Sequence, residues 1–174
     1  MGFIHSIKKS LYAKALASKT KALVSKRRFQ GWNTVEIYSI LFDYQGLFEL
    51  KDIERLADNL RDKGKIVHLL CYTGSISKDG LAYKTFDNKA ISFNLVPKSN
   101  IITEFTNRHV NILYNLIPLE REISEYISTT SNADFKIGLF DDNRNGLDLM
   151  INLKEANLME FIKTAERVLQ KTNL

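Results

Sequence analysis

The sequence predicts an α/β protein with a mixed, mostly parallel sheet and helices on both faces. A basic helical arm precedes it, and an antiparallel hairpin with a final helix closes it. Strand-like and helix-like segments alternate along the body of the chain, and one continuous apolar run has the length of a strand that is covered on both faces. The 174 residues fit a single α/β domain at 32–174 behind an arm at 1–31.

The first half of the body predicts a strand, a helix and a second strand. Residues 34–42 are rich in β-branched and aromatic side chains, and apolar residues recur at helical spacing over 49–62. Residues 65–72 are the continuous apolar run. A unit of this size implies parallel pairing through a crossover. The segment 73–88 is rich in turn residues and predicts a long loop.

The second half predicts further elements at 90–96 (short strand), 99–107 (short helix), 110–116 (strong strand) and 119–129 (helix). Two strand-like segments, 134–140 and 147–153, flank Asn145-Gly146. Because Asn-Gly is the strongest short hairpin signal, we expect these two segments to pair antiparallel. A last amphipathic helix is expected at 154–170.

Composition and charge limit the class of protein. Hydrophobic residues make up 44% of the chain and charged residues 26%, which are globular values. The single cysteine, Cys71, excludes an internal disulfide and a CxxC redox pair, and predicts a reducing, cytoplasmic location. No apolar run is long enough to cross a bilayer. The net charge is +5, yet the first 28 residues hold eight basic and no acidic side chains, so the rest sums to −3.

This charge asymmetry predicts that the arm contacts a polyanion. Basic tracts neutralise phosphates and release counterions, which favours RNA, possibly on a ribosome. The candidate nucleic-acid-binding residues are the basic side chains of the arm and an aromatic neighbour, Lys8, Lys9, Lys14, Lys19, Lys21, Lys26, Arg27, Arg28 and Trp32. Trp32 and Phe29 are equally suited to stacking on a base and to docking the arm on the core. An anionic membrane, a protein partner, and simple packing of the arm on the body are the alternatives.

A second hypothesis places a ligand at the carboxyl ends of the parallel strands, where open α/β sheets bind their ligands. The candidate pocket residues follow or end the three strongest strands and are Asp43, Tyr44, Thr73, Ser75 and Asn115. They predict a small-ligand or nucleotide-binding enzyme. The sequence has neither a GxGxxG nor a GxxxxGK[ST] motif, and it identifies no catalytic residue.

The other polar signals favour structural roles. Asp141 to Gly146 match the first half of a calcium loop, but position twelve is Asn152 and not glutamate, so a hairpin tip is favoured and no metal or cofactor is predicted. His68 lies inside an apolar strand and predicts a hydrogen-bonded core histidine. Cys71 is three residues away, which places it on the opposite face of an ideal strand and argues against a catalytic pair.

The stretches Ala133 to Gly138 and Leu147 to Asn152, the closing helix and the basic N-terminus together resemble a bacterial family of small basic proteins known only as a domain of unknown function. The resemblance covers most of the chain and implies a bacterial cytosolic protein. It assigns no catalytic residue. The leading hypothesis from the sequence is therefore a non-catalytic, RNA-binding protein whose arm contacts RNA while the α/β body serves as a platform.

Overall fold

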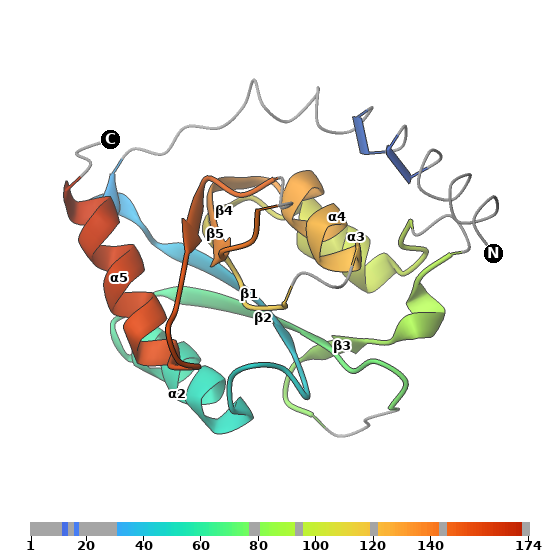
Figure 1. The fold of residues 1–174 in the computed structure, drawn as a ribbon, viewed down its shortest axis with the longest axis horizontal. Coiled ribbons are helices and arrows are strands. Elements are labelled where there is room, and N and C mark those ends of the chain that lie inside the picture. Colours follow the sequence, from blue (N-terminus) through green and yellow to red (C-terminus); the bar gives the residue numbers. More distant parts are fainter. Residues whose placement is uncertain are drawn as a thin grey trace.

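A computed structural model describes residues 12–13, 16–17, 31–76, 81–92, 96–118, 122–142 and 146–171. Within them lies a six-stranded, all-parallel sheet of order β3-β2-β1-β4-β5-β6 (Figure 1). The strands are β1 (Ile37–Asp43), β2 (Ile66–Tyr72), β3 (Lys84–Phe86), β4 (Val110–Asn115), β5 (Ala133–Leu139) and β6 (Leu149–Ile151). The helices are α2 (Leu50–Asp62), α3 (Asn100–Asn107), α4 (Glu122–Thr130) and α5 (Leu158–Lys171), with short 3-10 turns η2 (Trp32–Thr34) and η3 (Asn88–Ala90).

Two apolar cores lie on the two faces of the sheet. Helices α2 and α5 cover one face, and α3 and α4 cover the other (Figure 1). Successive residues of β1 alternate between them, since Ile40 and Phe42 belong to the α2/α5 core and Leu41 to the α3/α4 core. Burial on both faces explains why the central strands have continuous apolar sequences. The predicted α/β class with helices on both faces is confirmed, but the predicted mixed sheet is wrong, because all five strand pairs of the described residues are parallel.

The predicted antiparallel hairpin is wrong. Strands β5 and β6 are parallel, with Ile137 opposite Leu149 and Leu139 opposite Ile151. The chain after β5 therefore returns toward the beginning of that strand before β6 starts. Asp148 fixes this return, because its N–H donates to the carbonyl of Lys136 (2.8 Å) and its carboxylate accepts from the N–H of Lys136 (2.8 Å).

Two glycines give the returning segment its space. A Cβ at Gly146, whose φ is +82°, would lie 2.2 Å from Thr129 Oγ1 on α4. A Cβ at Gly138 would lie 2.6 Å from Leu147 Cδ1. Gly146 therefore lets the segment approach the end of α4 closely instead of forming a two-residue hairpin turn. Asn145, the other half of the predicted turn, lies outside the described residues.

The region between β2 and α3 also differs from its prediction. The expected loop at 73–88 contains β3, a strand of three residues that pairs with Leu70 to Tyr72 of β2. The strand expected at 90–96 is replaced by a single antiparallel bridge between Ile91 and Pro97. Strand β3 has only three residues, too few to give a repeating sequence pattern, and the turn residues around it predict a loop.

Candidate functional site

Two described residues of the N-terminal segment, Tyr12 and Leu16, contact the body on its α4 side. Tyr12 is 7% exposed, and its ring lies 6.3 Å from that of Tyr126. Its hydroxyl donates to Glu125 Oε2 at 3.4 Å, and Leu16, one helical turn later, packs against the same core. Apolar side chains thus attach this segment to the body. The eight predicted phosphate-binding residues, Lys8, Lys9, Lys14, Lys19, Lys21, Lys26, Arg27 and Arg28, lie outside the described residues.

Trp32, the aromatic candidate for base stacking, packs against the core on the α2/α5 side of the sheet. It begins η2, which contacts α5. This contact is the docking role that the sequence allowed for Trp32. Stacking of its ring on a base stays a prediction.

The five candidate pocket residues lie at the carboxyl ends of β2, β1 and β4, which are neighbours in the parallel sheet. At the end of β1, Asp43 is 6% exposed, and its Oδ1 accepts from the N–H of Gln45 (3.1 Å). The N–H of Tyr44, the residue between them, donates to the carbonyl of Tyr72 at the end of β2 (2.8 Å). A Cβ at Gly46 would lie 2.9 Å from Asp43 Cβ, so a tight turn encloses this carboxylate.

Thr73 and Ser75 attach the loop after β2 to the loop after β3. Thr73 Oγ1 donates to the carbonyl of Phe86 (3.2 Å), and Ser75 Oγ accepts from Asn88 Nδ2 (3.0 Å). Asn88 also accepts a hydrogen bond from the Tyr72 hydroxyl. These side chains fix neighbouring strands together.

Asn115 is completely buried and organises the connection from β4 to α4. Its Oδ1 accepts from the N–H of Ile117 (3.1 Å), and its Nδ2 donates to the carbonyl (3.1 Å) and hydroxyl (2.9 Å) oxygens of Ser124 and to the Ser128 hydroxyl. The side chain has no exposed surface to offer a ligand. The predicted residues thus lie together at the carboxyl ends of neighbouring strands. The polar atoms of Asp43, Thr73, Ser75 and Asn115, however, take part in local hydrogen bonds.

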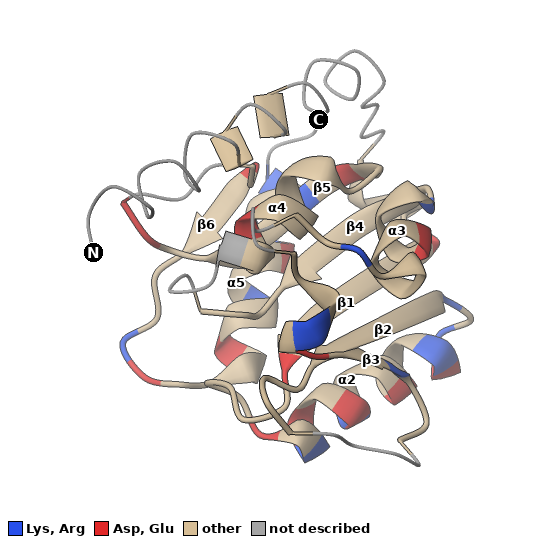
Figure 2. Cartoon of the chain, turned by 90° about the vertical axis from the view of Figure 1, so that its right-hand side faces the viewer, with Lys and Arg blue, Asp and Glu red and all other residues tan. Residues whose placement is uncertain are grey.

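A pocket of about 340 Å³ lies elsewhere, beside the first half of β2. Strand β3 pairs only with Leu70 to Tyr72, and no strand of the described chain lies beside residues 66–69 on that side. The pocket is lined by residues of this part of β2, of α3 and of α2. These two helices lie on opposite faces of the sheet (Figure 2). The pocket lining comes from four places, the end of α2, residues 67–70 of β2, residues 81–84 before and in β3, and α3 with the residue that follows it.

Three basic side chains line this pocket. Arg61, in the last turn of α2, pairs with Asp58 (Nη1 to Oδ1, 2.9 Å) and donates to the carbonyl of Val67 (3.5 Å). Lys84, the first residue of β3, pairs with Glu104 of α3. Both ion pairs are exposed and hence weak, so an incoming anion can share these cations at little cost.

The third basic side chain, Arg108, directly follows α3 and is held by His68. Its Nη1 lies 2.6 Å from His68 Nδ1. Because a guanidinium can only donate, Nδ1 must accept, so the imidazole is neutral and carries its proton on Nε2. Burial, followed by the charges of Arg108 and Arg61, lowers the pKa of His68 and keeps it neutral at physiological pH.

Glu104 is the acidic member of the lining. Its hydrogen bond with Lys84, and then the charge of Lys84, lower its pKa, so it stays ionised. Together with Arg61, Lys84, Arg108 and neutral His68, it gives the lining a net charge of +2 at neutral pH. The rest of the wall is largely apolar, with Val67, Leu69, Leu70, Leu81, Ile101 and Phe105. Such a lining suits an anion that carries an apolar part.

Sequence reasoning identified only one member of this pocket, His68, and assigned it to the core. The three basic residues lie far apart in the sequence and meet only because α2, β3 and α3 surround β2. The available signal was His68 itself, a polar side chain inside an otherwise apolar strand. Cys71 belongs to the α2/α5 core and Leu70 to the α3/α4 core. Because Leu70 is two residues from His68 and so on the same face of β2, this agrees with the expected placement of Cys71 and His68 on opposite faces. Burial raises the pKa of the Cys71 thiol to about 12.

The strand order and the pocket define a doubly wound α/β protein with a basic pocket at an edge strand. The chain belongs to a family of unknown function, DUF6913, whose model matches residues 6–172, which confirms the resemblance to an uncharacterised family. The match includes most of the basic N-terminal segment as well as the body. Neither a curated protein nor a solved structure matches the chain significantly.

Two other kinds of functional feature are absent from the described residues. None of their helices is both long and apolar enough to span a membrane. They also contain no group of three or more His, Cys, Asp or Glu side chains arranged to hold a metal ion.

Proposed function

We propose that the protein binds a small anionic ligand in the edge pocket formed by α2, β2, β3 and α3. One observation carries this proposal, the convergence of Arg61, Lys84 and Arg108 on a cavity of about 340 Å³. Guanidinium groups present planar sets of donors that match carboxylate and phosphate oxygens. The size lies in the range of about 300–1,000 Å³ that is usual for small-molecule sites.

The electrostatic arrangement supports an anion more than a cation. Only one carboxylate, that of Glu104, lines the pocket, and Lys84 already neutralises it. His68 cannot supply a negative charge, and its acceptor nitrogen, Nδ1, already accepts a hydrogen bond from Arg108. A cation would therefore meet net repulsion, whereas an anion gains favourable interactions with three side chains.

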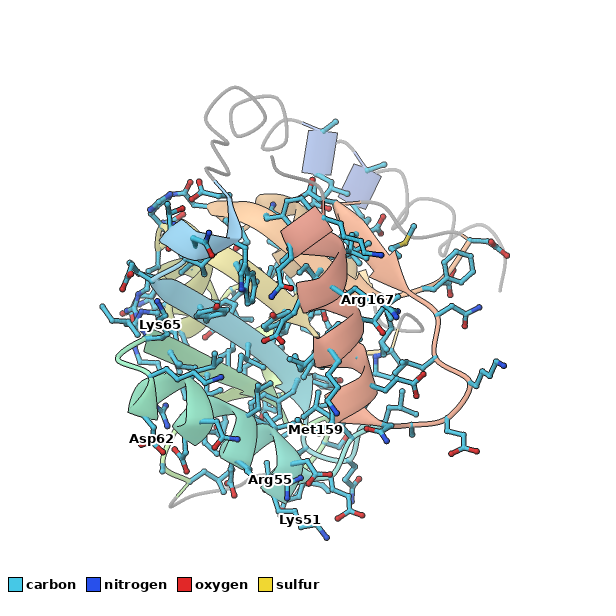
Figure 3. All side chains as sticks on the ribbon, turned by 90° about the vertical axis from the view of Figure 1, so that its left-hand side faces the viewer. Lys51, Arg55, Asp62, Lys65, Met159 and Arg167 are labelled. Atoms are coloured by element: carbon cyan, nitrogen blue, oxygen red, sulfur yellow. The ribbon has the colours of Figure 1, made fainter. Side chains whose placement is uncertain are left out.

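A matched pair of arginine variants tests the proposal. Arg61 and Arg55 both lie on α2 and both pair with the aspartate three residues earlier at 2.9 Å. Arg55, however, lies toward the other end of the helix from Asp62 (Figure 3) and does not line the pocket. We expect inorganic phosphate to bind the wild-type protein and Arg55→Gln equally, and Arg61→Gln at least fivefold more weakly, in an isothermal titration. Equal binding by all three proteins would contradict the proposal.

We propose RNA binding by the N-terminal segment as a second function, in a cytoplasmic and possibly ribosome-associated protein. The supporting observation is the distribution of charge, with eight basic and no acidic residues among the first 28 and a net charge of −3 in the rest. Neutralising roughly five to eight phosphates would make log affinity fall with log salt at a slope of about −4 to −7. In this proposal Tyr12 and Leu16 attach the segment to the body, and the basic side chains of the segment bind the polyanion.

The test of RNA binding must keep Tyr12 and Leu16, since deleting the segment would also remove part of a core. We therefore compare the full chain with a variant in which all eight basic residues at positions 8 to 28 become glutamine. Fluorescence anisotropy with single-stranded RNA should show a large loss of affinity and a flat salt dependence in the variant. Equal binding by both proteins would reject the proposal, as would binding of anionic vesicles with no binding of RNA.

A further inference from the structure

We infer that the ligand of the edge pocket is a phosphate monoester with an aromatic or other apolar body, bound as its dianion. This inference rests on the proposed binding of an anion in that pocket. It adds two requirements, a second negative charge on the ligand and an apolar group attached to it. Each requirement comes from a different part of the lining.

The charge of the lining argues for the dianion. Arg61, Lys84 and Arg108 supply three positive charges, and Glu104 supplies one negative charge. Asp58 pairs with Arg61 but does not itself line the pocket. A phosphate monoester carries about −1.5 to −2 at neutral pH and can neutralise the resulting charge of +2, whereas a carboxylate leaves part of it uncompensated.

The number and the placement of the donors also fit a phosphoryl group. His68 takes one of the five N–H groups of the Arg108 guanidinium and holds the group at the pocket. Arg61 is fixed in a similar way by Asp58 and by the carbonyl of Val67. Two oriented guanidinium groups and the mobile ammonium group of Lys84 provide donors from three elements, which suits the three oxygens of a phosphoryl group.

The apolar wall argues for the attached body. Leu70 and Phe105 belong to the α3/α4 core, and Ile101 packs against it, yet all three also line the pocket. Leu69, from the other face of β2, lines it as well. Leu70 and Phe105 are already almost fully buried, but free phosphate would leave the partly buried Leu69 and Ile101 in contact with water. An aromatic or aliphatic group would cover these two side chains and gain affinity from their burial.

His68 acts in this site as a positioning residue, because its ring nitrogen holds the guanidinium of Arg108, which in turn binds the ligand. A glutamine at this position would keep an acceptor for the guanidinium, whereas a leucine would remove it. We expect His68→Gln to bind within about threefold of the wild type, and His68→Leu to lose tenfold or more. A residue with only a packing role would give the opposite order, since leucine suits an apolar strand better than glutamine does.

Three small probes test the two requirements on the full-length protein. Phenyl phosphate has both features, inorganic phosphate lacks the ring, and phenylacetate keeps the ring but has a single charge. We expect phenyl phosphate to bind at least tenfold more tightly than either of the others at pH 7.5. Arg108→Gln should reduce this binding at least tenfold and Arg55→Gln should not change it, with circular dichroism and thermal unfolding confirming that each variant is folded.

The possible failures separate the two levels of the proposal. Phosphate binding as tightly as phenyl phosphate would overturn the apolar body, and phenylacetate binding as tightly would overturn the dianion. Either result leaves anion binding by the pocket intact. If none of the probes binds more tightly to the wild type than to Arg61→Gln, the anion pocket itself is rejected.

Discussion

Replacing Gly146 by alanine tests the parallel return between β5 and β6. The alanine would have to adopt the φ of +82° that Gly146 has, which costs an L-residue about 1 kcal/mol. Its Cβ would also lie 2.2 Å from Thr129 Oγ1 and 3.0 Å from Thr129 Cα, so α4 or the returning segment must move. Overpacking of this kind costs about 1–3 kcal/mol, which gives a total loss of about 2–4 kcal/mol.

Gly64 provides a matched control for the backbone term. Its φ is +76°, but a Cβ there would meet nothing within 4 Å. Gly64→Ala should therefore lose only about 1 kcal/mol. We expect urea unfolding to separate the two variants by about 1–3 kcal/mol, or by roughly 2–12 °C in thermal unfolding. If the two variants lose the same stability within about 0.5 kcal/mol, the close approach of Gly146 to α4 is wrong.

Three further predictions concern single side chains that the structure buries wholly or in part. Tyr12→Ala should lower the free energy of unfolding in urea by about 2–4 kcal/mol because it removes a buried ring beside Tyr126, and a loss below about 0.5 kcal/mol would mean that the segment is not docked. His68 has a lower pKa in the folded than in the unfolded protein, so stability should fall as the pH drops below about 6.5, and His68→Gln should flatten that part of the stability curve. Cys71, buried and with a pKa of about 12, should react with a thiol reagent at pH 8 only after unfolding, and rapid labelling of the folded protein would contradict its placement.

Local sequence patterns predicted those elements that are long enough to show a period. The helix expected at 49–62 is α2 at Leu50–Asp62, and the strand expected at 65–72 is β2 at Ile66–Tyr72. In α2 the buried residues Ile53, Leu56, Ala57 and Leu60 recur at helical spacing. Strand β2 is recognised by its uninterrupted apolar run instead, since a strand covered on both faces needs no alternation. The helices α3 and α5 agree similarly with the expected segments 99–107 and 154–170.

Features that depend on contacts between distant segments were not predictable in this way. Asn145-Gly146 has the local chemistry of a hairpin, but the position of Gly146 against Thr129 and the bonds between Asp148 and Lys136 select a parallel return. No local rule reports such contacts, because they belong to α4 and β5. The short length of β3 likewise matters only in relation to β2, whose first half pairs with β1 but has no partner strand on the β3 side among the described residues.

The two candidate sites differ for a related reason. Open α/β sheets usually bind their ligands at the carboxyl ends of the strands, and polar residues do gather there in this protein. There, however, Asn115 and Thr73 use their polar atoms to hold the chain itself. At the edge pocket, by contrast, Arg61 and Arg108 come from helix ends that have no sequence relation to each other.

The position of these arginines at helix ends suggests a simpler role that can be measured separately. A cation in the last turn of a helix interacts favourably with the helix dipole, usually by about 0.3–1 kcal/mol at an exposed site. Arg61 lies in the last turn of α2, and Arg108 is the residue that caps α3. If stabilising the helices were their whole role, replacing them would cost stability and leave anion affinity unchanged. For Arg61→Gln we expect such a loss of at most about 1 kcal/mol in urea unfolding, but together with at least fivefold weaker phosphate binding. Because Arg55→Gln removes an equivalent ion pair on the same helix, a difference between these two variants in binding but not in stability would assign Arg61 to the pocket.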